Sequence, residues 1–305
     1  MDKKKSNPLA RFRGFIQAGA TLLTNIHLPN FAKGTLYQGN GKYVCVPGLN
    51  CYSCPGAAGA CPVGAFQAVV GSSKFRFSYY ITGILILFGV LLGRFICGFL
   101  CPFGWFQELL HKLPSPKLST KKLKPLRYLK YAVLLVMVVL LPLLAVNELG
   151  MGDPFFCKYL CPQGVLEGAL PLSLTNAGIR AALGKLFTWK ACILLAVIMG
   201  SVVFYRPFCK WLCPLGALYA LFNRVSLFQM KVDRSKCVSC GKCAKACKMD
   251  VDVTKTPNHA ECIRCGMCVR ACPTSAVSFR YGFGDGKDKT KAAAMPQKNN
   301  DNKEK

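Results

Sequence analysis

Long apolar runs separated by shorter polar segments dominate the first 228 positions of the chain. Because a helix needs about 20 residues to cross a bilayer, four runs are candidates for membrane helices: about 14–28, 79–96, 126–146 and 189–205. The first run is short and follows Lys3, Lys4 and Lys5, but no small-x-small cleavage pattern comes after it, so we interpret it as a retained helix rather than a signal peptide. The pattern predicts an α-helical membrane bundle of about four transmembrane helices.

Basic residues flank these runs unevenly. A basic group precedes the first run, and seven Lys and Arg residues lie between positions 112 and 130. Since basic residues collect on the cytoplasmic side of a membrane, both segments and the region after the fourth run are expected inside, whereas 29–78 and 147–188 are expected to face outward. We therefore expect a multi-pass protein of the cytoplasmic membrane with both termini on the cytoplasmic side.

Composition agrees with a membrane protein that carries one modest soluble domain. The mean hydropathy is +0.30, and 40 basic residues against 13 acidic ones give a net charge of +27. Nucleic acid is not expected as a partner, because the charge lies beside the apolar runs and no recognisable basic reading motif accompanies it. The chain has 19 cysteines and only three histidines, and it lacks the Cys-x-x-Cys-His pattern that attaches c-type haem.

Eight cysteines after the last apolar run repeat one spacing. The copies are Cys237-x-x-Cys240-x-x-Cys243-x-x-x-Cys247 and Cys262-x-x-Cys265-x-x-Cys268-x-x-x-Cys272-Pro273. This pattern resembles the bacterial two-cluster ferredoxin, although Lys248 stands where the first copy would have proline. The resemblance implies two [4Fe-4S] clusters, one held by Cys237, Cys240, Cys243 and Cys272 and the other by Cys262, Cys265, Cys268 and Cys247. Two zinc sites are the alternative.

The chain thus divides into a transmembrane helical domain (1–228), an α+β ferredoxin-like domain (229–281) and a polar tail (282–305) expected to be disordered. Between positions 231 and 280 there are ten basic residues and four acidic ones. This charge favours an acidic redox protein such as ferredoxin or flavodoxin, or anionic lipid, as the neighbour of this domain.

Further cysteine pairs lie beside the proposed membrane helices, each ending in Cys-Pro-x-Gly. The motifs are Cys97-x-x-x-Cys101-Pro102, Cys157-x-x-x-Cys161-Pro162, Cys209-x-x-x-Cys213-Pro214 and a looser copy at Cys61-Pro62, preceded by Cys45, Cys51 and Cys54. Proline disfavours helical geometry in the residue before it, so a helix should end near the second cysteine and another begin at the proline. The N–H groups at that new helix start favour thiolates and an anionic cluster.

Two cysteines cannot complete a four-cysteine site, so the pairs must combine, and the expected topology indicates which can meet. Cys97, Cys101, Cys209 and Cys213 share the inner face. Cys157 and Cys161 share the outer face with the first-loop cysteines, of which we favour Cys54 and Cys61, with Cys51 or Cys45 as alternates. Up to two further [4Fe-4S] clusters follow, about 27 Å apart if an 18-residue helix separates them. Disulfides at the outer set and packed thiols at the inner set remain alternatives, and Cys192 is expected to be a small core residue.

Cys-x-x-x-Cys-Pro motifs beside membrane helices, followed by a two-cluster segment, resemble the NapH-type membrane polyferredoxins and the related NosR-type and CcoG-type proteins. The resemblance implies electron transfer from quinol, or from a low-potential cytoplasmic donor, toward an extracytoplasmic reductase or flavoprotein. The extra outer cysteines depart from the NapH pattern. The chain is expected to be an electron carrier or quinol-dehydrogenase-type subunit rather than a stand-alone enzyme. A redox or oxygen sensor, or a metallocentre-assembly factor, is the alternative.

Overall fold

The computed structural model describes residues 8–72, 79–148 and 150–282. Within them, the first half of the chain forms short and medium helices: α1 (Pro8–Arg11), α2 (Arg13–Thr24), α3 (Pro29–Lys33), η1 (Asn40–Tyr43), α4 (Pro62–Gly71), α5 (Tyr79–Leu92), α6 (Phe95–Phe99), α7 (Pro102–Leu110), η2 (Lys121–Tyr128), α8 (Leu129–Val133), η3 (Leu134–Leu140) and α9 (Leu141–Leu144).

The second half repeats this plan and ends in a small sheet domain. Its elements are η4 (Phe156–Leu160), η5 (Gly164–Ala169), α10 (Leu170–Thr175), α11 (Ala177–Ala181), α12 (Lys185–Val203), α13 (Pro207–Trp211), α14 (Pro214–Phe222), β1 (Phe228–Val232), α15 (Lys242–Lys245), α16 (Met267–Ala271) and β2 (Val277–Tyr281).

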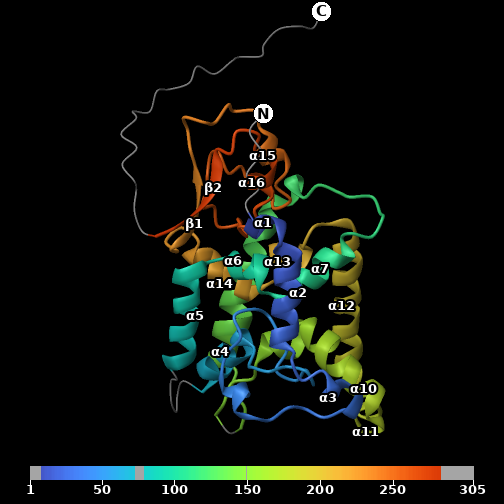
Figure 1. Ribbon diagram of the computed structural model, residues 1–305. Coiled ribbons are helices and arrows are strands. Elements are labelled where there is room, and N and C mark those ends of the chain that lie inside the picture. The colour runs from blue at the N-terminus through green and yellow to red at the C-terminus, as the bar shows by residue number, and fades with distance from the viewer. Residues whose placement is uncertain (1–7, 73–78, 149, 283–305) are drawn as a thin grey trace, which may run out of the picture.

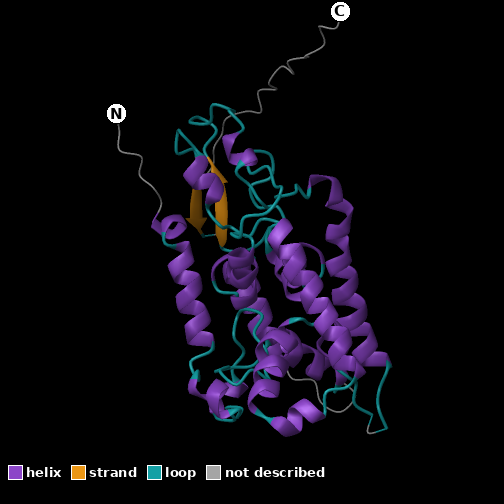
Figure 2. Cartoon of the chain, turned by 90° about the vertical axis from the view of Figure 1, so that its right-hand side faces the viewer, coloured by secondary structure: helices purple, strands orange, loops and turns teal. Residues whose placement is uncertain are grey.

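The helices form a bundle, and the domain made of β1, β2, α15 and α16 covers one end of it (Figure 1). Helices α3, α10 and α11 lie at the opposite end. Figure 2 shows the long helices running along a common direction beneath the two strands. The expected ferredoxin-type domain therefore stands on one end of the helical part.

Two stretches are long and apolar enough to cross a membrane among the described residues: Leu123–Leu144, which joins several consecutive helical elements, and α12. The other two expected spans are shorter in the structure, since α2 has 12 residues and α5 has 14. Helix α5 ends early because Gly93 adopts a left-handed conformation with φ +53°, which breaks the apolar run expected over 79–96. A bundle of four full-length spans is thus not confirmed.

Cys192 differs from its expected place. It is exposed on α12 rather than buried, because most of α12 faces away from the rest of the protein. Its side chain is not part of the core.

The ferredoxin-type domain has two matching halves. Strands β1 and β2 pair antiparallel, from Phe228 opposite Tyr281 to Val232 opposite Val277. Left-handed residues recur at equivalent places in the two cysteine loops: Ser239 with Arg264, Gly241 with Gly266, and Asp250 with Ser275. Backbones that alternate in this way point successive N–H groups inward and form concavities for anions. Because Asp250 and Ser275 match, the turn after Cys247 has the same form as the turn after Cys272, although Lys248 replaces the proline.

Ion pairs join this domain to the bundle. The carboxylate of Glu261 contacts the side chains of Arg94 and Lys130, and all three side chains are at most 4% exposed. A second carboxylate, Asp250, contacts Lys210 at 3.1 Å and Arg127 at 3.3 Å. Buried pairs of this kind add little when complete, but they leave an uncompensated charge when one partner is removed. The docking of the two parts therefore depends on these contacts.

Glu261→Gln is expected to lower the free energy of unfolding by about 3–5 kcal/mol, because it leaves Arg94 and Lys130 buried without their counter-charge. Burial alone would raise the pKa of Glu261, but Arg94 and Lys130 lower it from 4.5 to about 2. The contribution of this carboxylate is therefore complete above pH 4.5 and is lost as pH falls toward 2. Thermal unfolding of the purified protein measures the effect. Exposed Glu148 offers the control: Glu148→Gln should leave the unfolding temperature unchanged, and an equal loss in both variants would contradict the account.

Candidate iron–sulfur sites

Three of the four Cys-Pro-x-Gly motifs start a helix directly after the cysteine, whereas Cys161 is also extended but the helix that follows it, η5, begins only at Gly164. Cys61, Cys101 and Cys213 are extended residues directly before helices α4, α7 and α14, and proline is the first helical residue each time. The predicted helix start at the proline is confirmed for these three motifs. At Cys213 the sulfur accepts the backbone N–H of Gly216 at 3.3 Å. The proline fixes the turn, and the glycine N–H then favours a thiolate.

The motif glycines of the outer site, Gly64 and Gly164, also keep space open beside the sulfurs. The N–H groups of Gly64, Gly104 and Gly164 likewise face Cys61, Cys101 and Cys161. A Cβ on Gly64 would lie 3.7 Å from the Cys157 sulfur, and one on Gly164 would lie 3.9 Å from the Cys51 sulfur. A larger residue at either position would therefore project into the space between the cysteines.

Four cysteines from two distant segments meet at the inner site. Cys97 lies on α6 and Cys209 on α13, both in five-residue helices that end just before Cys101 and Cys213. Burial and the neighbouring thiols of Cys209 and Cys97 raise the pKa of Cys101 to about 12. The thiols of Cys209, Cys97 and Cys101 likewise surround Cys213. The structure thus brings together the whole set expected for the inner face.

The outer site differs from the favoured set in one residue. A cavity of about 200 Å³ is lined by Cys51, Cys61, Cys157 and Cys161. Burial and the nearby Cys61 thiol raise the pKa of Cys157 to about 12. Cys51, one of the two alternates, occupies the place expected for Cys54.

The reason for this exchange lies in the local hydrogen bonds. The Cys54 sulfur points to Asn25 and donates to its Oδ1 atom at 3.4 Å, whereas the backbone N–H of Cys51 is fixed by the carboxylate of Glu167 at 2.9 Å. The other alternate, Cys45, is buried beside Ala60, with which it forms a short parallel bridge.

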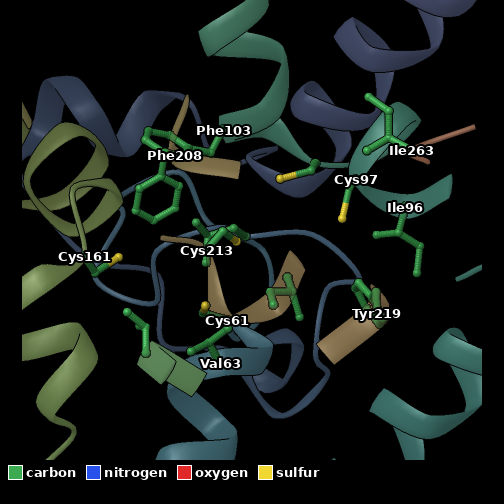
Figure 3. Packing of buried hydrophobic residues seen from close by; sticks show 14 of the residues in the cluster. Cys61, Val63, Ile96, Cys97, Phe103, Cys161, Phe208, Cys213, Tyr219 and Ile263 are labelled. Atoms are coloured by element: carbon green, nitrogen blue, oxygen red, sulfur yellow. The ribbon is translucent and has the colours of Figure 1, made fainter. Parts of the chain in front are cut away.

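The inner and outer sites are neighbours rather than a helix length apart. Gly48 packs against the inner site, where a Cβ would come within 2.8 Å of the Cys101 Cα atom, and the next two residues, Leu49 and Asn50, line the outer cavity. The fully buried Tyr219 has thiols of both sites around it. Figure 3 shows the closeness of Cys61, Cys161, Cys213 and Cys97 in one core. The first loop, expected to face the outer side of the membrane, thus enters the bundle and contacts both sites.

The ferredoxin cysteines surround two hollows, one for each expected group. The first hollow is lined by Cys237, Cys240, Cys243 and Cys272, and the second by Cys247, Cys262, Cys265 and Cys268. The fourth cysteine of each copy therefore lies with the first three of the other. That these cysteines bind clusters remains a prediction.

The second hollow lies against the inner site. Gly98, which follows Cys97, packs on the backbone of Ile263, where a Cβ would come within 2.3 Å of the carbonyl oxygen. Lys210, which follows Cys209, donates to the carbonyl of Lys248, the residue after Cys247. Cys247 and Cys265 pack against the same core as the membrane cysteines. The four cysteine groups therefore follow one another from the sheet domain into the bundle.

The residues present fit iron–sulfur clusters. No three His, Cys, Asp or Glu side chains in the part of the chain that the structure describes lie close enough for a single metal ion, whereas four cysteines spread around a cavity suit a larger cluster. The guanidinium of Arg206 is fully buried, lies against Gly104 and has no hydrogen-bond partner at Nη2. Its Nε atom pairs with the carboxylate of Glu108 at 2.9 Å, and an anionic cluster at the inner site would provide an acceptor for Nη2.

Two buried glutamines at these sites were missed from the sequence. Gln67 donates through Nε2 to the sulfur of Cys157 at 3.1 Å, and Gln107 donates to the sulfur of Cys209 at 3.2 Å. Both follow Cys-Pro-x-Gly by the same interval, so the longer pattern Cys-Pro-x-Gly-x-x-Gln was the available signal.

These features define an iron–sulfur protein with a ferredoxin-type domain and cysteine sites within a helical part. Segments 59–80, 77–121, 131–170 and 187–235 match the Fer4_5 family, described as a 4Fe-4S binding domain. Segments 230–251 and 256–278 match the Fer4 family, which has the same description. The chain belongs to the family of membrane polyferredoxins of the NapH and NosR type. It is an iron–sulfur electron-transfer protein.

Relatives span archaea and bacteria. Uncharacterized protein MJ0750 of Methanocaldococcus jannaschii is 31% identical over 66% of this chain and 77% of its own length. Putative electron transport protein YccM of Escherichia coli is 27% identical over 56% of this chain and 45% of its own length. Ferredoxin-type protein NapH of Haemophilus influenzae is 26% identical over 58% and 55%, respectively. No solved structure matches the chain at a significant level.

The outer site yields a direct comparison of two neighbouring cysteines. Cys51→Ser is expected to remove one cluster, about four iron atoms per chain, because Cys51 lines the cavity. Cys54→Ser should leave the iron content unchanged, since its sulfur points to Asn25. Iron and sulfide analysis of anaerobically purified variants measures both. Loss of iron in Cys54→Ser with none in Cys51→Ser would restore the set favoured from the sequence.

Proposed function

We propose that this protein relays electrons across the cytoplasmic membrane through four cysteine sites arranged in sequence. The observation that carries the proposal is the path of the first loop, which packs Gly48 against the backbone of Cys101 at the inner site and lines the outer site with the next two residues, Leu49 and Asn50. [4Fe-4S] clusters bound at the four sites would supply one-electron transfer. The ligands we propose are the two ferredoxin sets together with Cys97, Cys101, Cys209 and Cys213 and with Cys51, Cys61, Cys157 and Cys161.

The proposed topology has four membrane passages with both termini and the ferredoxin-type domain, residues 229–281, in the cytoplasm. Helices α2 and α5 would provide the two shorter passages beside Leu123–Leu144 and α12. The short passages are compatible with sites that lie deep in the bundle, because loop residues and short helices fill the remaining depth. Irregular backbone at membrane depth is tolerated where protein covers it.

The cytoplasmic end suits an acidic donor. Cys240 of the first ferredoxin hollow is exposed, and Lys236, Lys242 and Lys245 lie close to it in the chain. A basic surface beside a redox site attracts acidic partners and increases their association rate. A ferredoxin or flavodoxin is the partner class we propose here. Quinol is the alternative donor, by analogy with the NapH-type proteins.

The outer end opens into a second, larger cavity of about 970 Å³. Cys61, Gly64 and Cys157 line both this cavity and the outer site. Small residues of α4 form one wall, and three tyrosines line it as well: Tyr37, Tyr43 and Tyr52. We propose that the extracytoplasmic acceptor, a reductase or flavoprotein, or else a quinone, exchanges electrons with the outer site through this cavity.

An oxygen or redox sensor is the second candidate function. A sensor would need only slow exchange at its clusters, whereas a relay needs all four sites in turn. The rate of electron transfer across a membrane separates the two.

Protein in sealed vesicles provides this test, with reduced ferredoxin outside and the impermeant oxidant ferricyanide inside. Wild-type protein should transfer electrons inward in those molecules whose ferredoxin-type domain faces outward. Cys101→Ser with Cys213→Ser should abolish transfer and lower the iron content by about four per chain, because both ligands belong to the inner site. Cys192→Ser is the matched control and should behave as wild type. Undiminished transfer in the double variant would show that the inner site takes no part in the relay and would contradict the proposed order of sites.

Filling the larger cavity should block the outer end without loss of clusters. Ala68 lines the cavity on α4, so Ala68→Trp is expected to slow electron exchange at the outer site by about tenfold or more at unchanged iron content, since the closest approach becomes longer. Ala182→Trp, at an exposed position outside the cavity, is the control. Equal rates in the two variants would place the exchange elsewhere.

A further inference from the structure

Two glutamines hold the same position in the first two Cys-Pro-x-Gly helices. Gln67 on α4 and Gln107 on α7 are both 0% exposed. An amide buried to this degree is costly unless its atoms find hydrogen-bond partners. The hydrogen-bond partners of each amide therefore indicate the role of the glutamine at this position.

The orientation of each amide is fixed by the backbone. The Oε1 atom of Gln67 accepts the N–H of Phe156 at 2.9 Å, and that of Gln107 accepts the N–H of Phe208 at 3.2 Å. Because a backbone N–H can only donate, the oxygen must face it, and the amide nitrogen must then face the sulfur. Each glutamine thus holds the residue before a cysteine and donates to the sulfur of that cysteine.

The equivalent positions in the other two motifs do not repeat this contact. Glu167 accepts the N–H of Cys51 at 2.9 Å, and Tyr219 donates to the carbonyl of Pro47 at 3.0 Å. Each membrane site therefore receives one glutamine. This glutamine lies on the helix that follows one cysteine of the site, and its amide donates to another cysteine of the same site, which comes from the other half of the chain.

We propose that Gln67 and Gln107 set the reduction potentials of the outer and inner sites by donating an N–H to one ligand sulfur at each. A reduced cluster carries one more negative charge than an oxidised one, so a donor to sulfur stabilises the reduced form and raises the potential. The glutamines are positioning residues in this account, because they act through Cys157 and Cys209. The inference rests on the proposed function in that it requires clusters at both membrane sites.

The test replaces each glutamine by methionine, which has a similar length and no donor. EPR-monitored redox titration of the full-length protein then measures each site, with signals assigned from the Cys51→Ser and Cys101→Ser variants. Gln67→Met should make reduction of the outer site about tenfold less favourable, a shift of about 59 mV to more negative potential for one electron, and should leave the inner site unchanged. Gln107→Met should shift the inner site in the same direction and by about the same amount, and should leave the outer site unchanged.

Each variant thereby contains its own control in the site that keeps its glutamine. Gln17→Met adds a second control, since Gln17 is also buried but donates to the carbonyl of Gly98 at 3.0 Å rather than to a sulfur. It should change neither potential. Unchanged potentials in all three variants, or equal shifts at both sites in any one of them, would overturn the proposal.

The two levels of the account fail in different ways. A measured content of about eight iron atoms per wild-type chain would show that the membrane sites hold no clusters, and it would contradict the relay as well. A full iron content with unaltered potentials would contradict only the role of the glutamines. Where a methionine variant loses its cluster, pulsed EPR of wild-type protein labelled with ¹⁵N in glutamine side chains decides: coupling of the label to both membrane clusters supports the proposal, and its absence overturns it.

Discussion

Cysteine directly before a helix that begins with proline is the constraint on which the membrane sites depend. The proline forces the cysteine into an extended conformation, so the sulfur lies over the free N–H groups of the next helix turn. The glycine that follows supplies one of these N–H groups and leaves room beside the sulfur. At Cys213 this contact is 3.3 Å long. Three of these turns, together with the extended Cys161 before η5, place the cysteines of the inner and outer sites.

The continuity of the four sites depends on a second constraint, the ionic docking of the ferredoxin-type domain. Glu261 and Asp250 lie in the cysteine loops of that domain, and their basic partners lie in the helical part. Arg264 adds donors to the carbonyls of Leu92 at 2.8 Å and Asn223 at 2.6 Å. These contacts hold the Cys247 and Cys265 side of the domain against the inner site, so the domain has little freedom to swing away.

The sequence was sufficient to predict those parts of the structure whose geometry is determined by local spacing. The resemblance to two-cluster ferredoxins implied the exchange of Cys247 and Cys272 between the two ferredoxin groups. The helix starts at Pro62, Pro102 and Pro214 followed from the restriction that proline imposes. The grouping of the inner cysteines followed from topology, because their two segments are equivalent parts of an internal repeat.

Long-range packing explains what the sequence did not reveal. The distribution of charge predicted that residues 29–78 face the outer side of the membrane, but it did not reveal that this loop enters the bundle, where Gly48 packs on Cys101 and Leu49 and Asn50 line the outer site. Nothing local distinguishes Cys51 from Cys54; the difference comes from Glu167, more than a hundred positions away. Helix α5 ends at the left-handed Gly93, and α2 ends where the carbonyl of Thr24 accepts hydrogen bonds from Ala58 and Asn50 of the first loop; apolar runs therefore overestimated the length of both helices.

The adjacency of the inner and outer sites is the central claim, and the magnetic interaction of their clusters tests it most directly. Anaerobically purified protein should contain about sixteen iron atoms per chain, four for each site. On full reduction, its EPR spectrum should show spin coupling between the two membrane clusters, and Cys51→Ser should abolish that coupling while the inner cluster remains. About sixteen irons with isolated, uncoupled membrane signals would contradict the proximity, and about eight irons would contradict the membrane sites themselves.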